Sequence, residues 1–281
     1  MNAPVEQITA ALLRQWQLPE PGSSKHGRGH VLVIGGARST PGAVLLAGLS
    51  ALRVGAGVLA MAVPESVAIP LAIAIPESAV QGWQSADDDR IKDLLGQAGA
   101  VLVGPGLDDP DVATALVRAV AETAPADLPL VLDAYALGVL PKLDRSPWAR
   151  RSVLTPNATE AGYLLDTEVD DDARPQDVAA QIAQRWDCVV SFQGAVAEPG
   201  GAVRMVATGH AGLGTSGSGD VLAGSITGLL ARGVEPSRAA CWGTYLHAAA
   251  GDRLAARIGR LGFLARELLD EIPLVLTELQ A

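Results

Sequence analysis

The chain has 281 residues, of which 49% are hydrophobic and only 4% aromatic, and its formal net charge is −10. This length fits one large α/β domain or two small ones. The only basic run is the pair Arg150 and Arg151, so the composition argues against a nucleic-acid groove. An acidic protein can still bind an anionic nucleotide through local backbone amides and a metal ion.

Cysteine use and hydropathy bear on the cellular compartment. Cys188 and Cys241 lie in apolar runs without a partner at zinc-ligand spacing, which favours two small buried side chains. Residues 1–10 contain no apolar signal core. The longest apolar region, residues 43–63, is interrupted by Arg53 and three glycines, which is typical of a helix followed by a strand. We therefore expect a soluble cytoplasmic protein that has no membrane partner.

The first predicted elements form a strand–helix–strand unit. Residues 31–34 are a β-branched run that ends at Gly35 and Gly36, a helix is expected from Pro41 to about residue 54, and 58–63 form the next strand. A unit of this kind is typical of a parallel sheet. Further strands are predicted at 100–103, 130–132, 153–154 and 189–192, with helices from 110, at 157–165 and at 175–186.

The last third of the chain begins with a predicted hairpin. Residues 195–197 and 203–207 are separated by a short turn, which favours a hairpin at the sheet edge. From residue 218 onward the pattern is helical, with breaks at 233–236 and near 262. Because no composition shift or repeat divides the chain, we expect residues 1–281 to form one α/β domain. Its mostly parallel central sheet would have helices on both faces and an edge hairpin.

Small and polar residues follow six successive predicted strands. They are Gly35-Gly36, Gly104-Pro105-Gly106, Asp133, Thr155-Pro156-Asn157, Gln193-Gly194 and the loop before Asp220. Each of these could individually be ordinary turn chemistry. Because ligands of such folds bind at the carboxyl ends of the strands, the series predicts a nucleotide cleft there.

The most informative stretch is Gly-Leu-Gly-Thr-Ser-Gly-Ser-Gly-Asp-Val-Leu-Ala-Gly at 212–224. Glycines allow positive φ and close approach of a ligand, and the first amides of a helix hold anions. Asp220 falls at the helix start, where a carboxylate can take a proton from an attacking hydroxyl. The alternative is that these glycines only cap the helix, and only the structural context separates the two interpretations.

The order of these motifs resembles the ribokinase-like superfamily, and within it the ADP-dependent NAD(P)H-hydrate dehydratase family. The resemblance is carried by 25–36 (KHGRGHVLVIGG), 41–43, 51–57, 104–107, 132–134, 154–156, 214–224 and the Gly262-Phe263 pair. Sugar and vitamin kinases share the Gly-Ser-Gly-Asp turn but not the GHVLVIGG block. That block is the more discriminating signal.

The resemblance implies a repair reaction on hydrated NADH or NADPH (NADHX or NADPHX). The family phosphorylates the C6 hydroxyl of the hydrate from ADP, or from ATP in eukaryotic relatives, and loss of phosphate restores the dihydronicotinamide. Asp220 would take the hydroxyl proton, the amides of Gly217, Ser218 and Gly219 would hold the developing anion, and Mg²⁺ would bridge the phosphates. The sequence does not identify the metal ligands.

The family's binding residues transfer to particular positions of this chain. The hydrate contacts correspond to Ala43, Gly106, Asn157 and Asp220. The adenine-nucleotide contacts correspond to Gln193, Gly194, Ala195, Val196, Ala197 and Gly219.

Three positions depart from the family pattern. Asn157 replaces a His, Gln193 a Lys and Ala197 a Thr. Asn and Gln can donate hydrogen bonds but carry no charge, so weaker nucleotide binding or slower catalysis is expected. Arg38 or Arg204 could act as a substitute cation, although both fit solvated surface positions.

For several other polar residues the sequence allows both a functional and a structural interpretation. Asp133 could contact the metal or substrate, or cap a helix. The acidic runs 87–89 and 170–172 fit helix N-terminal charge and a solvated loop better than metal clusters. His247, in an apolar helix, is expected to be a core or interface histidine, whereas His210 could lie near the nucleotide.

Two alternative functions stay open. One is a kinase for a small alcohol such as a thiazole, a hydroxymethylpyrimidine or a sugar. The other is a catalytically weak or inactive nucleotide-binding homologue, which the three departures favour and the intact Gly-Ser-Gly-Asp turn opposes. In the family an epimerase domain is often fused ahead of this domain. Since the first predicted strand begins at residue 31, no such fusion is expected here. A homo-oligomer, a tetramer by resemblance, is also expected.

Overall fold

A computed structural model describes residues 5–20 and 22–280, so the first four residues of the 1–10 stretch lie outside the described residues. The ten strands of the described chain form one sheet in the order β1-β10-β9-β8-β7-β6-β5-β2-β3-β4. Pairing is parallel except where β9 meets β8 and β10. The strands are β1 (Glu6–Ile8), β2 (His30–Ile34), β3 (Val58–Pro64), β4 (Ser78–Trp83), β5 (Ala100–Val103), β6 (Leu130–Leu132), β7 (Ser152–Leu154), β8 (Val189–Phe192), β9 (Ala195–Ala197) and β10 (Val203–Val206).

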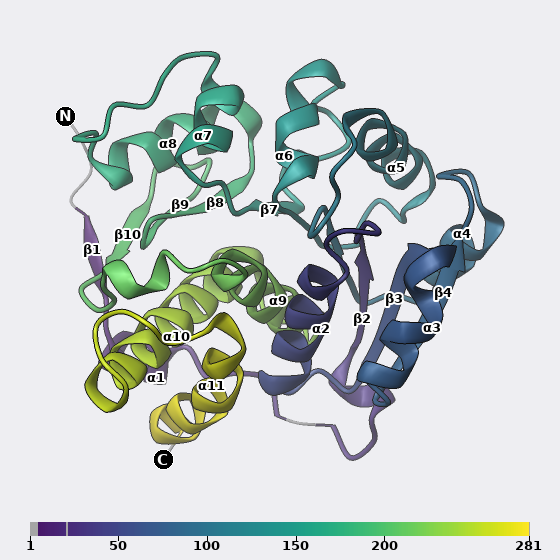
Figure 1. Cartoon of the computed structure of the whole chain (residues 1–281). Coiled ribbons are helices and arrows are strands. Elements are labelled where there is room, and N and C mark those ends of the chain that lie inside the picture. The colour runs from purple at the N-terminus through teal and green to yellow at the C-terminus, as the bar shows by residue number, and fades with distance from the viewer. Residues whose placement is uncertain (1–4, 21, 281) are drawn as a thin grey trace.

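Helices cover both faces of this sheet (Figure 1). Residues of β2 alternate between the faces: Val31 and Val33 contact one hydrophobic cluster, and Leu32 and Ile34 the other. The first cluster includes α1 (Ala10–Gln15), α2 (Gly42–Arg53), α3 (Glu65–Ala74), α9 (Ser218–Ala231), α10 (Pro236–Arg257) and α11 (Ala265–Gln280). The second includes α4 (Asp89–Leu95), α5 (Pro110–Thr123), α6 (Tyr135–Val139), α7 (Ala158–Leu165) and α8 (Pro175–Trp186). Short 3₁₀ turns lie at η1 (His26–Arg28), η2 (Leu140–Lys142) and η3 (Ala211–Leu213).

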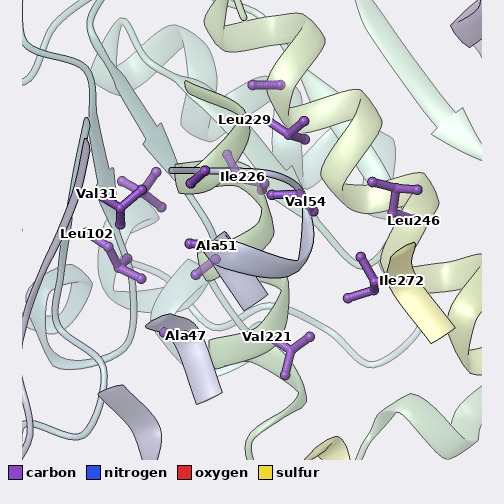
Figure 2. Packing of buried hydrophobic residues seen from close by; sticks show 14 of the residues in the cluster. Val31, Ala47, Ala51, Val54, Leu102, Val221, Ile226, Leu229, Leu246 and Ile272 are labelled. Carbon is purple, nitrogen blue, oxygen red and sulfur yellow. The ribbon is translucent and has the colours of Figure 1, made fainter. Parts of the chain in front are cut away.

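The packing of α2 against α9 places the start of each helix at the same end of the sheet. A Cβ added at Gly224 would lie 2.1 Å from the Ala47 carbonyl oxygen, and one at Gly228 would lie 2.5 Å from that of Ala51. These glycines therefore let the two backbones touch. Figure 2 shows the apolar side chains around this contact, including Ala47, Ala51 and Ile226. The close contact fixes the position of α9 against α2, and Asp220 lies in the first turn of α9.

The predicted α/β class and its mostly parallel sheet are confirmed, and so are the predicted strands from residue 31 onward. The predicted edge position of the hairpin is wrong, because β1 pairs with β10 and forms the edge itself. The first strand of the described chain is therefore β1 and not residues 31–34. The prediction also missed β4, α3 and α4. The apolar run 67–75 that forms most of α3 is interrupted by Pro70, which is unusual inside a helix.

Several minor expectations have clear outcomes. Cys188 and Cys241 are buried free thiols, and Asp88 caps α4, both as expected. The run 170–172 is exposed before α8. Across residues 5–20 and 22–280, the helices are too short or too polar to span a bilayer.

Candidate active site

Two loops at the carboxyl ends of β2 and β5 bring Ala43 and Gly106 together. The Gly36 amide donates to the Pro105 carbonyl at 2.7 Å, and Thr40 Oγ1 donates to the Gly106 carbonyl at 2.6 Å. A Cβ at Gly106, whose φ is +69°, would lie 2.9 Å from the Ala43 Cβ. Two residues predicted to contact the hydrate thus lie side by side, and glycine at position 106 lets the two loops pack this closely.

The glycine turn leads into α9 with little side-chain support. Gly217 is the N-cap, with φ +88° and no side-chain capping bond. At Gly219 an added Cβ would meet no atom within 4 Å. The Ser218 amide donates to the Thr215 carbonyl at 3.1 Å, whereas the Gly217 and Gly219 amides have no protein acceptor within the described residues. Two of the three amides predicted to hold an anion are therefore available for one, and the Ser218 amide is already bonded.

Three carboxylates converge beside this turn. Burial, with a smaller effect of the Glu160 carboxylate, raises the pKa of Asp220 to about 6. Burial also raises the pKa of Asp133 to about 8, with added repulsion from Asp220 and Glu160. Near neutral pH Asp220 is therefore mainly ionised and Asp133 mainly protonated. A base whose pKa lies near the working pH is well suited to proton transfer.

Asp133 does not cap a helix, so that reading of the sequence is wrong. The N-cap of α6 is Ala134, which makes no side-chain bond. Instead, Asp133 Oδ1 accepts a hydrogen bond from Thr155 Oγ1 at 2.8 Å, and the carboxyl group is buried. The Asp133 carboxyl group thus lies at the carboxyl end of β6, near enough to Asp220 and Glu160 for their charges to raise its pKa.

Asn157 and Glu160 cap α7 reciprocally. Asn157 Oδ1 accepts from the Glu160 amide, and Glu160 Oε2 accepts from the Asn157 amide, both at 2.9 Å. Asn157 is exposed, so its side-chain NH₂ group is free to meet a ligand. Glu160 is not among the predicted site residues. The Asn-x-x-Glu spacing of a capping box was the available signal.

The predicted nucleotide stretch is divided between a turn and a strand. Gln193 and Gly194, with φ +44° and +85°, form the turn between β8 and β9. The side chains of Ala195, Val196 and Ala197 are buried in β9. Only the turn is open to a ligand here. A hydroxyl at position 197 would point into the protein interior, so its loss in this chain removes no surface group.

The candidate substitute cations have different surroundings. Arg204 bonds Glu6 at 2.8 Å, pairs with Glu198, and lies over the Trp16 ring. It is therefore held on the β1 side of the sheet and is not a substitute cation. Arg38 is exposed in the loop after β2, at the same end as the carboxylates.

Two histidines, His210 and His247, lie near the glycine turn. His247 is a buried core residue, as expected, but its Nε2 lies 2.8 Å from Ser218 Oγ, a contact that no sequence signal indicated. His210 Nδ1 accepts from the Gly212 amide at 2.9 Å, and its Nε2 is buried without a hydrogen-bond partner among the described residues.

A cavity near these carboxylates is not lined by any of them. It has a volume of about 890 Å³ and lies between α6, α7 and the loop that follows α7. Among the described residues, no three His, Cys, Asp or Glu side chains are arranged to hold a metal by themselves. The chemistry of the site thus depends on free amides, Asp220 and what a ligand brings with it.

Comparisons with known proteins agree with this geometry. Residues 31–274 match the family described as NAD(P)H-hydrate dehydratase. The chain is 44% identical to the ADP-dependent (S)-NAD(P)H-hydrate dehydratase of Xanthomonas campestris, over 98% of this chain and 97% of that protein. It is 37% identical to the bifunctional NAD(P)H-hydrate repair enzyme of Moorella thermoacetica, over 97% of this chain but only 54% of that protein.

A solved structure is similar over its whole length. It is the ADP/ATP-dependent NAD(P)H-hydrate dehydratase of Bacillus subtilis co-crystallised with ATP and Mg²⁺, with a TM-score of 0.83 and 28% identity. The match covers 98% of this chain and 99% of that chain.

Proposed function

Since the chain belongs to the NAD(P)H-hydrate dehydratase family, we propose that Asp220 initiates the repair of hydrated NADH and NADPH in this protein. The enzyme is a nucleotide-dependent dehydratase of the ribokinase-like superfamily, as its 44% identity to the Xanthomonas dehydratase over nearly the full length of both chains indicates. The observation that carries the catalytic proposal is the position of Asp220. It lies in the first turn of α9, beside two amides for which the described residues offer no acceptor.

The reaction has two steps, and the side chains act mainly in the first. The C6 hydroxyl oxygen of the hydrate attacks the terminal phosphorus of the nucleotide, Asp220 takes the hydroxyl proton, and the nucleotide leaves one phosphate shorter. The Gly217 and Gly219 amides stabilise the charge on the transferred group. Cleavage of the C6–O bond then releases phosphate, and loss of a proton from C5 restores the ring double bond.

Ala43, Gly106 and Asn157 fit the hydrate side of this reaction. Ala43 and Gly106 are both partly exposed near the start of α2, and the exposed NH₂ group of Asn157 can donate to the hydrate. On the nucleotide side, the Gln193–Gly194 turn and Gly219 are the accessible parts of the predicted set.

Mg²⁺ fits the donor chemistry of the site. Mg²⁺ commonly binds one or two carboxylates together with substrate phosphates, so it does not need a ready-made protein cluster. Glu160 has one carboxylate oxygen outside its capping bond and lies close enough to Asp220 and Asp133 to raise the pKa of both. We assign Glu160 as the protein group that would hold the ion. Bound there, Mg²⁺ would neutralise phosphate charge.

The test is recovery of the reduced-nicotinamide absorbance from (6S)-NADHX, with Mg²⁺ and either ADP or ATP. Recovery that requires a nucleotide and is lost in Asp220→Asn would support the proposal. Accumulation of a stable phosphorylated product would instead indicate a small-alcohol kinase. Nucleotide binding without turnover would indicate the inactive homologue that Asn157 and Gln193 suggest.

Two expectations about the whole protein stay predictions. We expect residues 1–281 to act as one domain and to assemble into a homo-tetramer. Light scattering after size-exclusion chromatography measures the assembly directly.

A further inference from the structure

A buried hydrogen bond joins the catalytic turn to α10. His247 Nε2 lies 2.8 Å from Ser218 Oγ, and the two residues are only 9% and 3% exposed. Ser218 is the first residue of α9. Elsewhere these helices meet through apolar atoms; for example, a Cβ at Gly243 would lie 2.5 Å from Ile226 Cγ1. A polar pair within this apolar contact needs an explanation, because burying polar groups costs free energy.

The neighbours of Ser218 suggest what the bond does. Gly217 and Gly219 flank it, and neither has a side chain to fix the turn. Gly217 adopts φ +88°, and Gly219 has no atom within 4 Å of its Cβ position. Glycine-rich backbone has many accessible conformations. The Ser218 side chain is therefore the anchor between the two glycine amides, and His247 holds it.

The charge state of His247 agrees with a positioning role. Burial lowers the pKa of this imidazole to about 4, so the ring is neutral at neutral pH. A neutral ring adds no cation beside the phosphates, and its partner Ser218 is itself buried. His247 can thus orient the turn, but it cannot replace the missing cation at position 193.

We propose that the His247–Ser218 hydrogen bond is a positioning contact, which fixes the first turn of α9 so that the Gly217 and Gly219 amides and Asp220 face the reacting phosphate. This proposal rests on the proposed function. His247 acts through Ser218 and does not touch the reacting atoms. Preorganised donors of this kind make a large contribution to phosphoryl transfer, and small displacements are costly.

Kinetics of matched variants test the contact. Ser218→Ala and His247→Leu should each lower kcat by about 10- to 100-fold. The double variant should lose little more than either single one, because both changes remove the same bond. His247→Gln, which can still bond Ser218, should recover much of the rate.

Two buried hydroxyl pairs on the same helices supply controls. Ser225 in α9 lies 2.7 Å from Ser50, and Thr244 in α10 lies 2.8 Å from Ser191. Ser225→Ala and Thr244→Val remove comparable buried hydrogen bonds away from the turn. If these controls reduced kcat as much as Ser218→Ala, the effect would be general destabilisation and the proposal would be wrong.

Amide hydrogen exchange gives a readout that needs no activity. In Ser218→Ala and His247→Leu, residues 213–222 should exchange faster than in the unchanged protein, while the Ser225→Ala control keeps the original rate there. If the unchanged protein lacks dehydratase activity but exchange responds in this way, the proposed function is wrong. The proposal that the contact orders the turn is then still supported. Unchanged exchange, or faster exchange with full kcat, overturns the contact as a determinant of catalysis.

Discussion

The starts of α7 and α9 face the same group of carboxylates but are built in opposite ways. At α7, Asn157 and Glu160 cap each other's amides at 2.9 Å. At α9, Gly217 makes no side-chain cap, and two neighbouring amides have no protein acceptor in the described part of the chain. A helix that satisfies its own amides gains stability, whereas one that leaves them free can bind an anion. In this comparison α9 supplies the free amides for the phosphate, whereas α7 is a capped helix that carries Glu160, the group proposed to hold Mg²⁺.

The two helix starts are also coupled electrostatically. Glu160 belongs to the cap of α7, and its carboxylate contributes to the raised pKa of Asp220 in α9. Glu160 of α7 thereby raises the pKa of the catalytic carboxylate in α9. Substitutions at one helix start at a time separate the two contributions.

The largest expected effect is at Asp220. Asp220→Asn removes the proton acceptor but keeps the shape of the side chain, so kcat should fall on the order of a thousandfold, within the range for general bases. Steady-state kinetics with saturating hydrate and nucleotide measure this. Asp88→Asn is the control, because Asp88 is also a carboxylate at a helix start but caps α4. Full activity in Asp220→Asn would remove Asp220 from the mechanism.

The next effect concerns the glycines of α9. Gly217→Ala places a Cβ on a left-handed residue and 2.5 Å from Leu46 Cδ1, so it should cost about 2 kcal/mol of stability. Gly219→Ala meets nothing within 4 Å and has no positive φ, so its thermal midpoint should not fall. Its new methyl group should instead raise the KM for the nucleotide. Equal loss of stability in both variants would contradict the described geometry.

The sequence predicts this catalytic turn well because the information is local. Glycines, a following apolar helix and one carboxylate are contiguous at 212–224. The opposite holds for β1, where three residues become a strand only by pairing with β10, which lies far away in the sequence at Val203–Val206. Likewise, Ser78–Trp83 becomes β4 through its pairing with β3. Short strands of this kind owe their structure to tertiary contacts that no local pattern contains.

The same limit applies to the site. The His247–Ser218 bond joins residues 29 positions apart in the chain, and spacing gives no sign of it. The coupling of Asp133, Glu160 and Asp220 depends on three elements meeting in space. Residue types at the strand ends were predictable, but their partners and their proton affinities required the fold.

The pH dependence of the reaction tests the link between the two helices. Because burial and Glu160 raise the pKa of Asp220 from 3.8 to about 6, kcat should fall about tenfold for each pH unit below that value as the base becomes protonated. Glu160→Gln keeps the capping bond, since Gln also fits a capping box, but it removes the charge. In the protein without Mg²⁺, the pKa of the Asp220 carboxyl group, followed by carbon-13 NMR, should therefore be lower in this variant. A pKa that stays unchanged would mean that Glu160 does not influence Asp220.

The smallest effect separates the two roles of Asn157. Asn157→Ala removes the cap of the Glu160 amide and should cost about 1 kcal/mol. Asn157→Asp keeps an accepting oxygen, so its thermal midpoint should match that of the unchanged protein. It has lost the NH₂ donor, however, and therefore the KM for the hydrate should rise in both variants. If the KM stays constant in Asn157→Asp, then Asn157 serves only as the cap of α7 and does not contact the hydrate.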